Sequence, residues 1–119
     1  MKKVLLVGLF VGASLVSARS RVAEVRARLK QATTLEMAWV QEMDRCESDL
    51  YKIGMEVPEG IHVSIRCLDG DTASSPRVRF AVRVCDDQGL CRFADEEFNI
   101  TDFAREGVVF EPFVPVKGR

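Results

Sequence analysis

The fold is decided by residues 20–50, which read SRVAEVRARLKQATTLEMAWVQEMDRCESDL. This stretch contains neither proline nor glycine, and its apolar residues recur at steps of three and four, the spacing that places side chains on one face of an α-helix. The pattern predicts a long amphipathic helix over residues 20–50, with Ser20 as its N-terminal cap and Glu36 at the edge of the apolar face. The residues on that face are Val22, Val25, Leu29, Ala32, Leu35, Trp39, Met43, Cys46 and Leu50.

After Gly54 and Pro58 the apolar period changes from three or four residues to two, which is typical of half-buried strands. Residues 61–67 and residues 77–84 both alternate between apolar and polar side chains, and residues 91–93 predict a third strand. Residues 96–101 and 108–114 are candidates for further extended segments. We therefore predict an α+β fold in which one long N-terminal helix packs on an antiparallel sheet of three to four strands.

Residues 1–18 have the three-part pattern of a secretory signal peptide. Lys2 and Lys3 precede an uncharged apolar run over residues 4–16, and small residues follow up to Ala18. As a helix the run would reach roughly 20 Å, whereas the hydrocarbon core of a membrane is about 30 Å thick. We expect cleavage after Ala18, so that residues 19–119 form one exported domain, periplasmic or secreted, with no stable membrane insertion after cleavage.

The charge balance and the histidine count argue against two classes of function. Removing residues 1–18 leaves fifteen basic against eighteen acidic residues, a net charge of −3, which argues against binding nucleic acid or an anionic lipid surface. His62, the single histidine, lies on the polar side of the first predicted strand, and the sequence contains no Gly-x-Ser-x-Gly motif to supply a nucleophile. We therefore predict that the protein is not an enzyme and needs no cofactor.

Four cysteines in an exported chain predict two disulfides, for which three pairings are possible. Cys67 shares the strand face expected to meet the helix, and Cys46 belongs to the apolar helix face, while Cys85 and Cys91 flank a short hairpin. This placement favours the pairs Cys46–Cys67 and Cys85–Cys91. The alternative is a metal site, which would need thiolates at ligand spacing, but the sequence has no Cys-x-x-Cys pair.

Two further groups of side chains are candidate binding sites. Arg77, Arg79 and Arg83 could line the outer sheet face and bind an anionic glycan or an acidic partner, or they could pair with acidic residues of neighbouring strands. Asp69 and Asp71, separated by one glycine, could offer carboxylates to calcium. The loop lacks the remaining ligands of an EF-hand, and an ordinary turn is the other interpretation.

Residues 36–42 (EMAWVQE), 50–54 (LYKIG) and 58–60 (PEG) together resemble the head domain of type IV pilin-like (pseudopilin-like) proteins. In that family a long helix leads into an antiparallel sheet, and a C-terminal disulfide loop is common. The resemblance covers about residues 22–67, and a signal peptide stands here in place of the usual pilin N-terminal assembly helix. It implies an exported protein that contacts envelope or assembly proteins, either in the cell envelope or in a secretion or pilus-type assembly. The alternative is a secreted adhesin or ligand-binding domain that uses the arginine-lined face.

Overall fold

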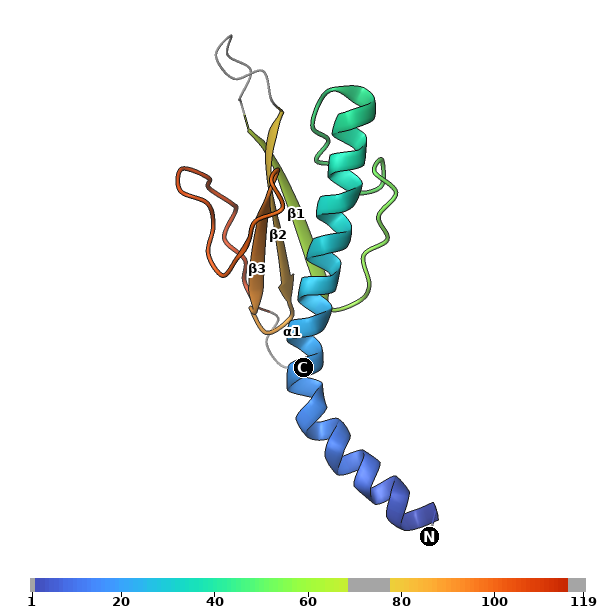
Figure 1. The fold of residues 1–119 in the computed structure, drawn as a ribbon. Coiled ribbons are helices and arrows are strands. Elements are labelled where there is room, and N and C mark those ends of the chain that lie inside the picture. The colour runs from blue at the N-terminus through green and yellow to red at the C-terminus, as the bar shows by residue number, and fades with distance from the viewer. Residues whose placement is uncertain (1, 69–77, 116–119) are drawn as a thin grey trace.

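The computed structural model describes residues 2–68 and 78–115, with side chains from residue 21 onward (Figure 1). It consists of one helix and one four-stranded antiparallel sheet in which the strands lie in chain order, β1-β2-β3-β4. The predicted α+β fold is therefore confirmed. The elements are α1 (Lys2–Met43), β1 (Ile61–Leu68), β2 (Arg79–Asp86), β3 (Cys91–Asp95) and β4 (Ile100–Thr101).

The hydrophobic core lies between α1 and one face of the sheet. Val25, Leu29 and Ala32 of the helix are fully buried there, as the apolar periodicity predicts. The strand residues in this core alternate along each strand, and the register places Ile65 opposite Val82. The buried strand side chains are Ile61, Ile65, Phe80, Val82, Val84 and Ala94.

The helix boundaries differ from the prediction at both ends. The chain is helical from Lys2, so Ser20 lies inside α1 and does not cap it. At the other end α1 stops at Met43, because Asp44 adopts a left-handed backbone conformation (φ 58°), which closes the last helical turn. Cys46 and Leu50, which fit the helical spacing of apolar residues, lie after the helix and pack against the same core from the following segment.

The segment formed by residues 44–60 is anchored to the core by apolar and polar contacts. Ile53 and Met55 are buried in the core. Glu36, which is fully buried on α1, accepts a hydrogen bond from the backbone N–H of Glu47 at 2.6 Å from its Oε1 atom. A helix side chain and two apolar residues thus hold this segment against α1.

Both predicted disulfides are confirmed, and together they use all four cysteines. The Cys46–Cys67 bond joins segment 44–60 to the end of β1, so it tethers the segment after the helix, not the helix itself. The Cys85–Cys91 bond joins directly opposed residues of β2 and β3. No cysteine thiolate remains as a metal ligand.

Residues 102–115, which we call the C-terminal segment, lie against the outer face of the sheet, the face turned away from α1 (Figure 1). Arg83 of β2 donates a hydrogen bond from Nη1 to the carbonyl oxygen of Glu111 at 2.6 Å. The Phe110 ring lies 5.1 Å from the Arg83 guanidinium and 5.7 Å from the Phe93 ring. The sheet is therefore packed on both faces. Within the described part of the chain, no helix combines the length and the apolar character that a membrane span requires.

Candidate functional site

A cavity of about 520 Å³ lies between the outer face of the sheet and the C-terminal segment. Ala81 of β2 and Phe93 of β3 line it from the sheet, and Phe103 and Phe110 line it from the C-terminal segment. The small Ala81 side chain, which faces outward between Arg79 and Arg83, leaves space that a larger residue would fill. The cavity volume lies in the range of about 300–1,000 Å³ that is common for ligand pockets.

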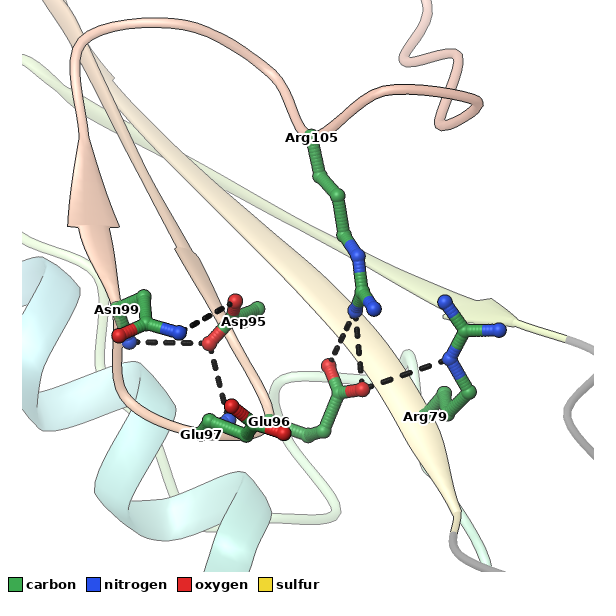
Figure 2. Close-up of polar contacts among 6 residues, drawn as sticks. All are labelled: Arg79, Asp95, Glu96, Glu97, Asn99 and Arg105. Atoms are coloured by element: carbon green, nitrogen blue, oxygen red, sulfur yellow. Dashed lines mark hydrogen bonds and ion pairs between the residues drawn. The ribbon is translucent and has the colours of Figure 1, made fainter. Parts of the chain in front are cut away.

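Glu96, which directly follows β3, holds two arginines beside this cavity (Figure 2). Arg105 Nη1 donates hydrogen bonds to both Glu96 carboxylate oxygens, at 2.9 and 2.7 Å, and Arg79 Nε lies 3.5 Å from Oε1 of the same carboxylate. The hydrogen bonds to Glu96 raise the pKa of Arg105 above its ordinary value, despite the opposing effect of burial. One carboxylate therefore fixes the C-terminal segment to β2.

Asp95 organises the turn between β3 and β4 (Figure 2). Its Oδ1 accepts the backbone N–H groups of Glu97 and Asn99, each at 2.9 Å, and its Oδ2 accepts the Asn99 side-chain amide at 3.1 Å. Partial burial alone would raise the pKa of Asp95, but these hydrogen bonds, with the charge of Arg105, lower it below its ordinary value. Asp95 is thus ionised at neutral pH, and both of its carboxylate oxygens accept hydrogen bonds within the turn.

We predict that Asp95→Ala lowers the free energy of unfolding by about 1 kcal/mol at pH 7, because the turn loses its hydrogen-bond acceptor. Since the pKa of Asp95 is lowered in the folded protein, its contribution should be present at neutral pH and disappear as the pH falls through that pKa. Urea unfolding at pH 7 and at low pH measures both effects. Asp102→Ala is the matched control, since the Asp102 side chain is 82% exposed, and an equal loss in the two variants would contradict the prediction.

The arginines predicted as a binding face are engaged within the chain where the structure describes them. Arg79 and Arg83 both lie on the outer face, where Arg79 pairs with Glu96 and Arg83 with the Glu111 carbonyl and the Phe110 ring. Burial lowers the pKa of Arg83, which the Glu111 charge partly offsets. Arg77 lies outside the described residues.

Of the remaining sequence candidates, His62 is described by the structure and does not line this cavity. His62 Nε2 lies 2.7 Å from Asp87 Oδ1, and its ring lies 5.0 Å from Phe113, with 43% of the side chain exposed. Asp69 and Asp71 lie outside the described residues. Among the residues that the structure describes, no group of three or more histidine, cysteine or acidic side chains is placed to hold a metal ion.

The cavity itself was not predicted from the sequence. Phe103, Arg105 and Phe110 come from a segment with no regular apolar alternation, and Arg105 lies beyond the short strand β4, where no regular element sets its spacing to Glu96. A local signal did exist for Asp95, because aspartate commonly caps a turn by accepting N–H groups two or more residues later in the chain.

Comparison with family models, with curated proteins and with solved structures finds no match for this chain. Function is therefore inferred from the residues and contacts described above. Chemically, the cavity offers three phenylalanine side chains, and two of the charged side chains beside it, Asp95 and Arg105, are already paired. Such a lining suits the burial of an apolar group.

Proposed function

We propose that this chain is an exported, non-enzymatic pilin-like protein that acts by protein–protein contact in the cell envelope or in a secretion or pilus-type assembly. The observation that carries the proposal is the form of α1. Over residues 21–43, which the expected cleavage after Ala18 leaves in place, one face of α1 packs against the sheet and the opposite face is exposed (Figure 1). A helix held in this way is presented to other proteins by a rigid head.

The two disulfides support export to an oxidising compartment. Two such bonds indicate a non-cytoplasmic protein, because disulfides persist in oxidising compartments. We assign the protein to the periplasm or the extracellular space, without stable membrane insertion after cleavage.

The side of α1 turned away from the core offers a surface for envelope or assembly proteins. Arg26, Lys30 and Thr34 are exposed along it, with Ala23 and Ala27 beside them. Small and long polar residues at helical spacing allow close approach of another helix together with charge pairing at its borders. The alternative, a secreted adhesin that uses the arginine-lined face, has less support because Arg79 and Arg83 already have partners within the chain.

Site-specific photo-crosslinking in the native host tests this function. The full chain would carry a photoreactive amino acid in place of Arg26, and we expect a discrete adduct in the envelope fraction, with the mature N-terminus at Arg19 by mass spectrometry. Tyr51, which is 90% exposed outside α1, is the matched position and should give no such adduct. Recovery of the protein in the cytoplasm, or equal adducts at both positions, would contradict the proposal.

A further inference from the structure

The cavity beside β3 is lined by aromatic rings that the fold leaves partly uncovered. Phe93 and Phe110 pack against each other at a ring separation of 5.7 Å. Phe103 lines the same cavity but has 71% of its surface exposed. A further aromatic ring entering the cavity would bury apolar surface on both sides and could pack edge-to-face against these rings.

The charges around the cavity indicate that its occupant is neutral. Arg105 is held by both oxygens of Glu96, and both oxygens of Asp95 accept hydrogen bonds from the β3–β4 turn. Glu106, the remaining charged residue of the lining, is exposed to solvent. A charged occupant would lose its hydration among the three phenylalanine rings, whereas a neutral apolar group would not.

Because the charged groups Asp95 and Arg105 are already paired, the cavity is better suited to bind a side chain of another protein than a free small molecule. Pockets for small molecules fix their ligand through a few polar groups that remain available, and here the Asp95 carboxylate is used within the chain. A side chain attached to a partner needs no such groups, because the surrounding interface orients it. Aromatic residues in pockets are the usual anchors of protein interfaces.

From this juxtaposition we propose that the cavity formed by Ala81, Phe93, Phe103 and Phe110 binds an aromatic side chain of the partner protein. The inference rests on the proposed function and adds to the α1 surface a second contact, for which it names the chemistry. It places the anchor of this second contact on the side of the sheet opposite α1.

Binding of a capped aromatic amino acid to the oxidised protein tests the cavity directly. N-acetyl-phenylalaninamide should produce saturable methyl NMR shifts at Ala81, Ile100 and Thr101, with a dissociation constant in the millimolar range, and N-acetyl-alaninamide should produce none. Ala81→Leu, which projects a larger side chain into the cavity, should weaken binding about tenfold or more. Val109→Leu is the matched control on the same segment, since Val109 is 75% exposed and does not line the cavity.

A second variant tests the cavity independently, in case Ala81→Leu does not fold. Phe103→Ala removes an exposed wall of the cavity and should weaken binding several-fold with the fold intact. Absence of saturable binding, or equal binding to wild type and both cavity variants, would overturn the inference.

A second photo-crosslinking experiment tests whether the partner protein occupies the cavity. A photoreactive amino acid in place of Glu106, at the cavity rim, should give an adduct that Ala81→Leu reduces and Val109→Leu does not. An adduct unaffected by Ala81→Leu would overturn the assignment to a partner side chain. If the Arg26 adduct forms but N-acetyl-phenylalaninamide does not bind, only the cavity inference fails; if neither position gives an adduct, the proposed function fails.

Discussion

Glu36 should make the protein less stable as the pH rises from about 4.5 to about 7, by about 3 kcal/mol, and Glu36→Gln should remove this dependence. Burial raises the pKa of Glu36 from 4.5 to about 7, with the Glu47 N–H bond opposing and the Glu47 charge adding to the increase. A difference of this size corresponds to about 3 kcal/mol at about 1.4 kcal/mol per pH unit.

The sign follows from proton binding in the two states. Between these pKa values the folded protein keeps the Glu36 proton and the unfolded chain has lost it, so raising the pH favours unfolding. The stabilising contribution is complete below about pH 4.5 and is lost as the pH passes about 7. The structure shows why the charged form is costly: Glu36 is fully buried, and its Oε2 atom has no partner among the described residues.

Urea unfolding of the oxidised protein between pH 4.5 and 8.5 measures this effect as the difference between wild type and Glu36→Gln. The glutamine keeps a carbonyl oxygen that can accept the Glu47 N–H but does not titrate in this range. Glu42→Gln is the matched control, because Glu42 is exposed on the same helix and should leave the slope unchanged. Parallel pH profiles for wild type and Glu36→Gln would contradict the prediction.

Removal of the Cys46–Cys67 bond should lower the free energy of unfolding by a similar amount. The double variant Cys46→Ala/Cys67→Ala opens a loop with a sequence separation of 21, and restricting a loop of that length in the unfolded chain contributes about 3 kcal/mol. The bond also ties segment 44–60 to the sheet, so its loss should expose that segment first. Urea unfolding without reductant gives the free energy, and limited proteolysis gives the order of exposure.

Ser48→Ala is the control for this experiment, since Ser48 is exposed in the same segment. It should change neither the free energy of unfolding nor the sites of cleavage. A double cysteine variant that unfolds at the wild-type urea concentration would show that the bond contributes nothing to stability.

Periodicity predicts the elements of this fold well but not the helix end. The helix face and the alternating strands were predicted because burial on one side imposes a regular spacing, and Val25, Leu29 and the strand core residues obey it. The helix end was wrong because Cys46 and Leu50 kept the spacing while belonging to the next segment. The φ of 58° at Asp44, which ends the helix, leaves no trace in the apolar pattern.

The cysteine pairing was predictable and the cavity was not, for one physical reason. Strand parity decides which cysteines share a face, so Cys67 and the Cys85–Cys91 pair followed from local sequence. The cavity depends on where the C-terminal segment lies, and that is set by contacts distant in sequence, such as Arg83 with Glu111. Glu36 was visible as an irregularity of the helix face, but its burial depends on segment 44–60 covering it.

The strand order β1-β2-β3-β4 also bears on how the chain reaches this structure. Because every strand pairs with its neighbour in sequence, the sheet can assemble from hairpins without a long search for distant partners. The β2–β3 hairpin, whose two cysteines are only six residues apart, should therefore oxidise early. The Cys46–Cys67 bond would then form later, once segment 44–60 has packed against the core and brought the two sulfur atoms together.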